Sequence, residues 1–331
     1  NHEPIIQLSH YYNNVAKQLY INTTFSYRFG QNTYSALNWY NAPDPRADYY
    51  RYLPSYFTRM ADPNGQDQAS SDRYTELWKT EPNVRYINWD RLYEANRGNL
   101  TTVRDASGRV LAEGRKALYM IEDRHTDQHE FAWATSGSWI PKNWLELVGG
   151  VNFRHNLTKN YATVGDLLGA DFVHDIDKFA ERDFGGDSRK SQVDLRHPDR
   201  IVQKGDHFSY DYDSRTTRYQ TWLNAIYHFR KLDAYSGLAY THTATQRDGK
   251  QQRGLFPENS FGLSDYIKFN DIAAKAGLTY KLNGHHYLQA NIAYVEQAPT
   301  FQNIFISPRT RNSYVDDPKS EKILSAEASY L

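Results

Sequence analysis

Residues 19–29 read LYINTTFSYRF, and this stretch determines how the rest of the chain is interpreted. Apolar, aromatic or threonine side chains occupy every second position from Leu19 to Phe29, and most of the intervening side chains, from Tyr20 to Arg28, are polar. Side chains alternate between the two faces of a β-strand, so this period of two predicts a strand with one apolar and one polar face. The apolar face must lie against a protein interior or against hydrocarbon.

The end of this stretch recurs twice later in the chain. FSYRF at 25–29, AIYHF at 225–229 and LTYKL at 278–282 each place a Tyr before a basic residue that is followed by Phe or Leu. A short polar turn is expected after each of them. Aromatic side chains at strand ends on the apolar face are typical of the water interface of membrane β-barrels. We therefore expect six residues at the membrane interface: Tyr27, Phe29, Trp139, Tyr227, Phe229 and Tyr280.

Composition limits the classes of protein that fit. The mean hydropathy of the 331 residues is −0.81, and no apolar run is long enough for a membrane helix. This excludes helical membrane proteins but not a barrel, whose strands show one apolar residue in two. Aromatic residues make up 15% of the chain, and 27 of them are Tyr, which suits an interfacial aromatic belt. The 39 basic residues balance the 39 acidic ones, so nothing indicates a nucleic-acid partner.

The absence of Cys excludes a disulfide framework and thiolate chemistry. The chain opens on Asn1-His-Glu-Pro, without the basic start and apolar core of a signal peptide. We therefore expect either that processing removed such a segment or that the chain is a piece of a longer protein.

Alternating segments and turn signals divide the remainder into hairpins. A turn at Gly30-Gln31-Asn32 is expected to end the first strand, and residues 33–41 are expected to return. Pro141-Lys-Asn143 and Asn283-Gly284 are further turn signals. These patterns predict about nine antiparallel strands joined in sequence. The expected strands are 17–30, 33–41, 116–140, 145–154, 208–230, 233–247, 268–282, 286–295 and 321–331.

The connections differ between the two ends of the predicted hairpins. Turns on one side have roughly two to four residues. The other connections are long, polar and rich in Gly, Asp, Asn and Pro: 42–115, 157–206, 248–263 and 298–320. We therefore predict an all-β fold, the antiparallel wall of a transmembrane β-barrel with long extracellular loops and short periplasmic turns. A large soluble antiparallel sheet with one wet face gives the same alternation and stays open as an alternative.

Few residues suggest a binding site. Residues 48–57, DYYRYLPSYF, are dense in aromatic side chains, which are favoured at binding surfaces because they bury area at little cost in conformational entropy. Ligand contact and packing within the loop are both open for Tyr49, Tyr52 and Tyr56. The same holds for Trp89, which lies in a helical pattern at 86–96.

An acidic segment could offer oxygen ligands to Ca²⁺, but it lacks the residue order of a known calcium loop, and 164–179 has the pattern of a short amphipathic helix. The segment contains Asp171, His174, Asp175, Asp177 and Glu181. Neither Gly-x-Ser-x-Gly nor His-Glu-x-x-His occurs. We therefore predict no enzyme activity, no metal site and no cofactor.

Two regions carry motifs of a known family. APTFQNIFISPRTRN at 298–312 is followed by PKSEKI at 318–323 and by the strand at 324–330. This order resembles the Ala-Pro-(Thr/Ser)-Phe stretch, loop and Lys-x-Glu-Lys strand start of TonB-dependent outer-membrane receptors, although DPKSE at 317–321 is a looser form of their usual Asn-Leu-Lys-Pro-Glu. NWYNAPDPR at 38–46 and INWD at 87–90 resemble the larger receptors of this kind from Bacteroidetes.

The resemblance implies a 22-stranded barrel closed by an N-terminal plug, which imports a scarce nutrient across the bacterial outer membrane with energy from TonB. The chain departs from this pattern, since it shows no plug and has room for fewer than half of those strands. We therefore expect 1–331 to be part of one β-barrel domain, an interior section of a longer receptor, with outer-membrane lipid around it and TonB acting through a plug outside this chain. Two alternatives remain. One is a non-transporting receptor-like barrel that partners a surface lipoprotein, and the other is a secreted carbohydrate-binding β-protein.

Overall fold

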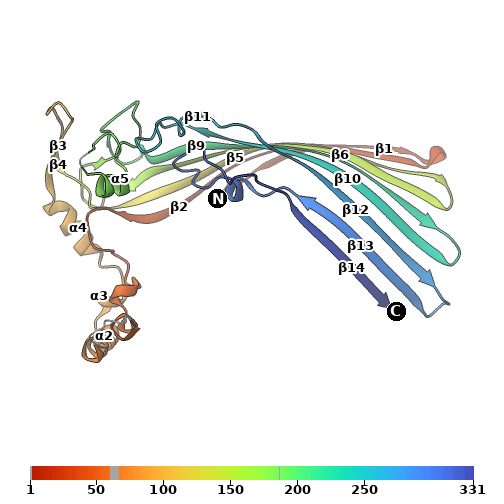
Figure 1. Ribbon diagram of the computed structural model, residues 1–331, viewed down its shortest axis with the longest axis horizontal. Coiled ribbons are helices and arrows are strands. Elements are labelled where there is room, and N and C mark those ends of the chain that lie inside the picture. Colours follow the sequence, from red (N-terminus) through yellow and green to blue (C-terminus); the bar gives the residue numbers. More distant parts are fainter. Residues whose placement is uncertain (1, 60–66, 186) are drawn as a thin grey trace.

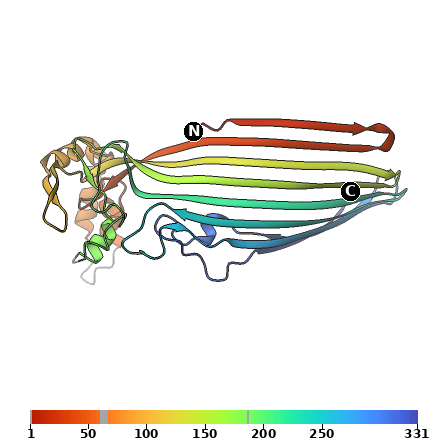
Figure 2. The same cartoon turned by 90° about the horizontal axis from the view of Figure 1, so that it is seen from above.

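A computed structural model describes residues 2–59, 67–185 and 187–331. Residues 60–66 and 186, which fall within two of the predicted long loops, lie outside the described residues. The described chain forms one antiparallel sheet of ten strands, in which consecutive long strands lie side by side (Figures 1 and 2). In order across the sheet, these strands are β1 (Ile5–Asn14), β2 (Leu19–Trp39), β5 (Tyr119–Lys142), β6 (Leu145–Asp166), β9 (His207–His228), β10 (Leu232–Gly249), β12 (Ile267–Lys281), β13 (Tyr287–Gln297) and β14 (Glu321–Tyr330), with β11 (Gly262–Leu263) paired to β10.

Long and short connections lie at opposite ends of this sheet (Figure 1). At one end, which we call the turn end, residues 15–18, 143–144, 229–231 and 282–286 join the strands. At the other, the loop end, the connections are 40–118, 167–206, 250–266 and 298–320. The predicted asymmetry of the connections is therefore confirmed, and β1 and β14 form the two edges of an open sheet in the described chain.

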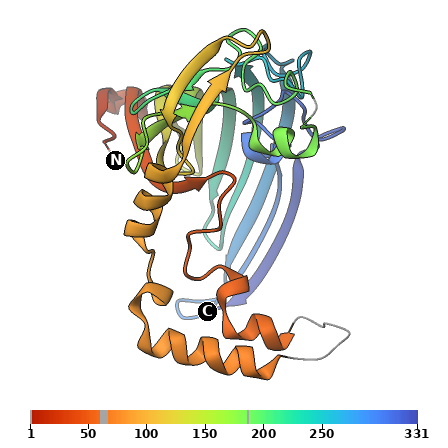
Figure 3. The ribbon, with the colours of Figure 1, turned by 90° about the vertical axis from the view of Figure 1, so that its left-hand side faces the viewer.

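The loop-end connections contain short elements of their own. They are η2 (Tyr50–Tyr52), α1 (Pro54–Arg59), α2 (Gln68–Thr80), α3 (Pro82–Arg85), α4 (Trp89–Gly98), β3 (Leu100–Arg104), β4 (Val110–Arg115), β7 (Val173–His174), α5 (Lys178–Asp183), β8 (Ile201–Val202) and α6 (Phe301–Ile304), while η1 (Val15–Lys17) lies in a turn. Figure 3, seen from the loop end, shows the sheet as an open arc and α1–α3 standing away from it on its concave side. Within the described ranges, no helix combines the length and the apolar character that crossing a membrane requires.

The predicted turn at Gly30-Gln31-Asn32 is wrong. Every residue of β2, from Leu19 to Trp39, has a partner in β5, so 17–30 and 33–41 are one strand. Gly30 has no left-handed φ. A Cβ added at Gly30 would lie 2.6 Å from the Cγ atom of Glu3, so the glycine makes room for the neighbouring chain. Gly30, Gln31 and Asn32 are residue types that favour turns, but here they lie in the middle of a long strand.

Two further boundaries differ from the prediction. β1 was not expected, because the adjacent Ile5 and Ile6 interrupt the alternation at its start. β6 continues to Asp166, so the loop expected to begin at 157 begins about ten residues later. The first difference adds a strand to the sheet, and the second lengthens one. The total of about nine long strands is correct only because the missed strand offsets the one that was split.

The two faces of the sheet have different surroundings. On the face that carries the apolar positions of β2, which we call the outer face, Leu8, Leu238 and Ile272 are 71%, 69% and 54% exposed. No described sheet or helix covers that face. On the opposite, inner face, loop segments cover the strands at the loop end and form a small core around Met120, Ala162, Val164, Val202, Phe208, Tyr210 and Tyr212. A soluble sheet would bury its apolar face, and this one leaves it open.

Candidate functional site

Aromatic side chains form a row on the outer face, about midway along the longest strands, that is interrupted only at β12. The ring centroids of Phe131 and Phe153 are 6.0 Å apart, and those of Phe153 and Tyr219 are 5.0 Å apart. We call this set the upper aromatic row. Its members are Tyr27, Phe131, Phe153, Tyr219, Tyr240 and Tyr294.

Strand register shows that the upper aromatic row runs obliquely to the strands. Tyr27 pairs with Phe131, but Phe131 pairs with His155, so Phe153 lies two residues closer to the turn end. The same two-residue step separates Tyr219 from Tyr240. On average the row shifts by one residue along the strand for each strand crossed. A shift of about 3.3 Å along a strand for about 4.8 Å across the sheet corresponds to a strand tilt of about 35°. Outer-membrane barrel strands are tilted by a similar angle.

A second row of aromatic side chains lies at the turn end. It contains Trp139, Tyr227, Tyr280 and Tyr330, and we call it the lower aromatic row. Trp139 is eight residues from Phe131, and Tyr227 is eight residues from Tyr219. Eight residues span about 26 Å along a strand and about 21 Å along an axis tilted by 35°. The apolar band of outer-membrane barrels is of this height, about 25 Å.

The structure separates the six predicted interface residues into different levels. Trp139, Tyr227 and Tyr280 lie in the lower row, next to the short turns. Phe229 lies in the turn after β9, stacked on Trp144 at 5.9 Å. Both Tyr27 and Phe29 were expected at a strand end, and this is wrong, because β2 continues for ten residues beyond Phe29. Tyr27 belongs to the upper row instead.

Sequence reasoning missed Trp144 and Tyr330. Trp144 follows the predicted turn at 141–143 directly, so its position after a turn could have marked it. Tyr330 could not be placed without the pairing of β13 and β14, which aligns it with Leu288 beside Tyr280.

The inner face carries a polar network. The Glu130 carboxylate lies 3.6 Å from an Arg28 nitrogen and 3.8 Å from an Arg154 nitrogen. Between β6 and the next strand, β9, Asn152 donates to Gln220 at 3.1 Å. Gln220 in turn donates to Thr241 at 3.1 Å. Charged and hydrogen-bonding side chains on this face are typical of a barrel lumen, whereas the outer face at the same level carries the upper aromatic row.

A pocket of about 340 Å³ opens on the inner face at the loop end. Strands β2 and β5 supply Asn38, Glu122 and Arg124. The loops supply residues around β7 and α5, together with Arg253 and Arg309. Glu122 is only 3% exposed, accepts a hydrogen bond from Asn38 Nδ2 at 2.6 Å and pairs with Arg124. The pocket therefore has a fixed polar floor built on the two strands.

The N-terminus of α5 places Lys178 beside this floor. The Asp177 carboxylate accepts from the backbone N–H groups of Phe179 and Ala180, each at 3.1 Å, and so caps the helix. Lys178 Nζ donates to Asn38 Oδ1 at 3.1 Å and to the Trp39 carbonyl at 3.0 Å. Burial lowers the pKa of the Lys178 ammonium. Its hydrogen-bond acceptors are neutral, and the nearby charges of Glu122 and Asp177 offset part of the effect of burial without forming an ion pair with it.

Two buried charges of opposite sign line the same pocket. The Asp175 carboxyl is 4% exposed, accepts from the Ser209 N–H at 2.9 Å and lies 3.4 Å from Arg200. Burial raises the pKa of Asp175. Arg253 is 6% exposed and donates from Nη2 to the Arg309 carbonyl at 3.1 Å. Its Nε atom is buried without a hydrogen-bond partner among the described residues.

Cations exceed anions on the pocket wall. Glu122 and Asp175 each have an arginine partner, and Asp177 caps α5. Lys116, Lys178 and Arg309 form no ion pair with a carboxylate within the described part of the chain. The Arg309 guanidinium instead lies over the Tyr210 ring at 4.5 Å. The balance of charge favours a negatively charged ligand.

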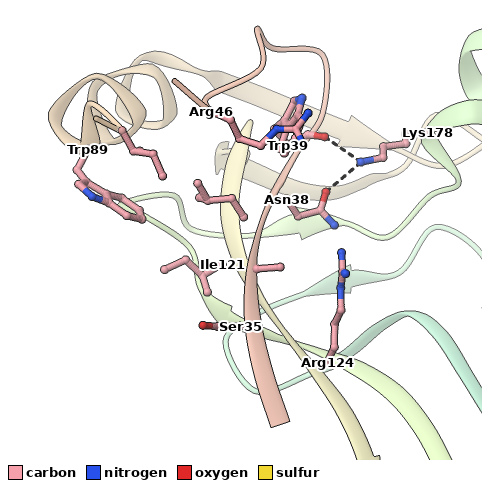
Figure 4. A pocket seen from close by; sticks show the side chains of 11 residues that line it. Ser35, Asn38, Trp39, Arg46, Trp89, Ile121, Arg124 and Lys178 are labelled. Atoms are coloured by element: carbon pink, nitrogen blue, oxygen red, sulfur yellow. Dashed lines mark hydrogen bonds between the residues drawn. The ribbon is translucent and has the colours of Figure 1, made fainter. Parts of the chain in front are cut away.

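A second pocket of about 590 Å³ surrounds the loop end of β2 (Figure 4). Figure 4 shows Trp89, Ile121 and Ser35 on one side of this strand and Arg124 on the other. Of the aromatic binding candidates, only Trp89 lines this pocket, and it is 44% exposed. β2 has no neighbour on one edge beyond Gln31 in the described chain, so this cavity belongs to an unpaired strand edge.

The other three aromatic candidates lie in the helical part of the first loop. Tyr49 contacts Tyr52 edge to face at 5.2 Å, and Tyr56 contacts Phe57 at 5.4 Å. Tyr52 donates to the Asp44 carbonyl at 3.2 Å. These contacts are packing within the loop. The structure does not bring them together with Trp89 around one cavity.

The acidic segment is divided among separate contacts. Asp171 accepts from the backbone N–H of Arg115 at 2.8 Å, whereas Asp175 and Asp177 have the roles described above. His174 lies 3.4 Å from Asp199. Burial, followed by the charge of Lys116, lowers the pKa of His174. Among the residues that the structure describes, no group of three or more His, Asp or Glu side chains could hold a metal ion.

The fold is that of an open section of a transmembrane β-barrel wall. A solved structure titled "Copper transporter OprC" is similar to it with a TM-score of 0.54 and 12% sequence identity, over 99% of this chain and 36% of that protein. Closed and open forms of the ferric-catecholate import receptor Fiu from E. coli K12 give TM-scores of 0.44 and 0.41, at 12% and 11% identity, over 99% of this chain and 37% of theirs. No protein-family model matches the sequence, and no curated protein matches it.

The chain thus spans little more than a third of the solved proteins it resembles. At such low identity the likeness establishes the fold. Ligand and energy source must be argued from the chain itself.

Proposed function

We propose that this chain is part of the barrel of an outer-membrane receptor that takes up a nutrient, with energy supplied by TonB. The observation that carries the proposal is the outer face. It is apolar, uncovered, and bounded by two aromatic rows about 21 Å apart along the barrel axis. In this proposal the loop end faces the exterior, the turn end faces the periplasm, and the two rows lie at the two membrane interfaces.

The inner face supports uptake rather than a purely structural role. Arg28, Glu130 and Arg154 would line the lumen and hydrogen-bond a plug belonging to the longer protein. The motifs at 298–312 and 318–323, which resemble those of TonB-dependent receptors, fall on α6 and the start of β14. TonB would act through that plug, since this chain supplies barrel wall and loops.

The ligand we propose is a small anionic solute, bound in the pocket between β2, β5, α5 and the loop around Arg253. Lys116, Lys178 and Arg309 are the cations available to it, and the buried Arg253 Nε is a donor without a partner in the described chain. A carboxylate or phosphate group would satisfy that donor at the charge-assisted strength that an arginine provides.

Fractionation of cells that express the full-length protein tests the membrane placement. We expect recovery with the outer membrane and release only by detergent. A monomer that stays soluble without detergent would instead support the secreted carbohydrate-binding alternative. Stoichiometric co-purification of a lipoprotein, without uptake of any solute, would support the non-transporting alternative.

A trisulfonated pyrene dye tests the ligand class in the purified protein. We expect its fluorescence anisotropy to report binding that weakens in the triple variant Lys116→Gln, Lys178→Gln, Arg309→Gln. A matched control removes Lys79, an exposed cation on α2, and should bind as the unmodified protein does. Equal loss in both variants, or tighter binding of a cationic rhodamine, would contradict an anion site.

A further inference from the structure

Three histidines lie at one level of the outer face, directly above the upper aromatic row. His129 is two residues from Phe131 on the loop-end side, and His155 stands in the same relation to Phe153. His242 is two residues beyond Tyr240 on β10. Because side chains two residues apart share a face, each imidazole follows one aromatic ring toward the loop end. We call His129, His155 and His242 the histidine row.

Each imidazole is held through the same ring nitrogen. His129 Nδ1 hydrogen-bonds the Tyr27 hydroxyl at 2.8 Å, and His155 Nδ1 hydrogen-bonds the Thr217 hydroxyl at 2.8 Å. His242 Nδ1 lies 2.8 Å from Asn270 Oδ1, which can only accept, so here Nδ1 carries the proton. None of the three Nε2 atoms has a hydrogen-bond partner among the described residues. The row therefore presents three free ring nitrogens on a face that no described segment covers.

Charged groups of both signs surround the histidine row. Lys268 on β12 lies in the same register row as His155, and Lys159 on β6 lies four residues beyond it. Both lysines are exposed and form no ion pair within the described ranges. Lys159 lies in register with Asp127 on β5 and Asp213 on β9. Asp213 is 3.1 Å from Lys250, and Arg215 on β9 is 2.7 Å from Asp248 on β10. Tyr27 is the facing titratable group on β2.

We propose that the histidine row, together with Lys159 and Lys268, binds the phosphate groups of membrane lipids. The upper aromatic row ends the apolar band, so the next pair of residues along each strand lies at the depth of the lipid headgroups. An imidazole that carries a proton on Nε2 donates to a phosphate oxygen, and a lysine ammonium adds a charge-assisted hydrogen bond to the same group. This inference rests on the proposed membrane placement and is independent of ligand uptake.

Lipid titration of the purified full-length protein in detergent tests the proposal. The probe is a phosphate-bearing anionic lipid, phosphatidylglycerol, with bound lipid counted by native mass spectrometry. We expect the triple variant His129→Gln, His155→Gln, His242→Gln to need several-fold more lipid at pH 6. Removal of each lysine should weaken binding roughly five-fold, the factor that one basic residue contributes near an anionic membrane. The triple His→Lys variant, which keeps a donor at each of the three positions, should retain lipid binding.

Two controls separate the histidine row from cations elsewhere on the barrel wall and from a site for free anions. Arg218→Gln with Lys275→Gln removes two exposed cations from β9 and β12 on the inner face, and lipid binding should not change. Inorganic phosphate at matched ionic strength should not displace the lipid, whereas displacement would indicate a site for free anions and overturn the proposal. Equal lipid binding by the unmodified protein and the His→Gln variant at pH 6 would also overturn it. Failure of the membrane placement itself would be recognised separately, as a protein that binds no lipid and needs no detergent.

Discussion

The rings of Phe153 and Tyr219 face each other across β6 and β9, with centroids 5.0 Å apart and planes inclined at 50°. An inclined aromatic pair at this separation is favourable by about 0.5–1.5 kcal/mol beyond its buried area. Phe153 also contacts Phe131 on β5, so the pair joins three strands at one membrane depth. Tyr219 lies four residues from the middle of the apolar band, so it defines the depth of nearby outer-face residues.

Leu223 lies midway between Tyr219 and Tyr227 on β9 and is 55% exposed on the outer face. Leu223→Arg places a charge at the centre of the bilayer, so we expect it to destabilise the folded protein by about 2–4 kcal/mol. The matched control is Asn224→Arg, at the same depth on the inner face. Urea titrations of folding into lipid vesicles measure both. Equal losses in the two variants would mean that our assignment of the faces is wrong.

Asn96 on α4 is completely buried and connects three segments of the loop end. Its Nδ2 donates to the carbonyl groups of Tyr119, Leu167 and Leu168 at 2.8, 3.0 and 3.0 Å. Its Oδ1 accepts from the N–H groups of Leu118 and Tyr119 at 2.8 and 3.0 Å. Asn96→Ala leaves these buried groups unpaired, at about 1–3 kcal/mol for each unsatisfied group.

Hydrogen exchange measures this effect directly. We expect the amides of Leu118 and Tyr119 to exchange much faster in Asn96→Ala. The exposed Glu94→Ala, on the same helix, should leave them protected. Unchanged protection in Asn96→Ala would show that the side chain is not what joins α4 to β5.

Gly254 lies against the segment that precedes β8. A Cβ added there would stand 2.0 Å from the Arg189 carbonyl oxygen and 2.7 Å from that of Lys190, and both are backbone atoms that cannot rotate away. We therefore expect Gly254→Ala to separate the two loops at a cost of about 1–3 kcal/mol and to speed protease cleavage of the loop at 187–192. Gly98→Ala, where a Cβ meets nothing within 4 Å, is the control. Cleavage at the same rate in both variants would count against this packing.

Hydrogen bonds from Arg115 lower the pKa of Asp171 from its ordinary value to about 2. A carboxyl with a depressed pKa contributes its full stability above the unfolded pKa of about 4, and loses it as the pH falls through the folded value. We expect the Arg115 amide to stay protected from exchange at pH 4 and to lose protection toward pH 2. In Asp171→Asn, protection should be weaker at pH 7 and flat over this range. An unmodified protein that loses protection already near pH 5 would contradict the shift.

Alternation along the strands was enough to predict the sheet, since Leu19 to Phe29 and Ile272 to Tyr280 show their faces without any knowledge of their neighbours. Alternation did not show where a strand ends if the strand continues with polar residues into water, as β2 does after Gly30. Turns and solvated parts of strands use the same polar residue types. The upper aromatic row also could not be read from the sequence. Its members differ in position along each strand, and only the register shows that they share one depth.

The candidate pocket was beyond sequence reasoning for a different reason. Asp175 and Lys178 come from one connection and Arg253 from another, and their proximity depends on how those two loops fold over the strands. The acidic segment was noticed for its composition, but its carboxylates serve other contacts. The contact between Ser209 and Asp175, 34 residues apart, could not have been anticipated locally.

The length of the central strands has a consequence for ligand capture. β5 has 24 residues, whereas about 9–11 suffice to cross a bilayer, and Glu122 in the pocket floor lies nine residues beyond Phe131. Seven of these residues lie beyond His129, at the depth of the lipid headgroups, and at the strand tilt they correspond to about 19 Å of height. Electrostatic potentials in physiological salt decay over about 8 Å, so the surface charge of the bilayer is attenuated by more than two decay lengths at the pocket floor. A solute arriving at the pocket therefore meets mainly the field of the protein.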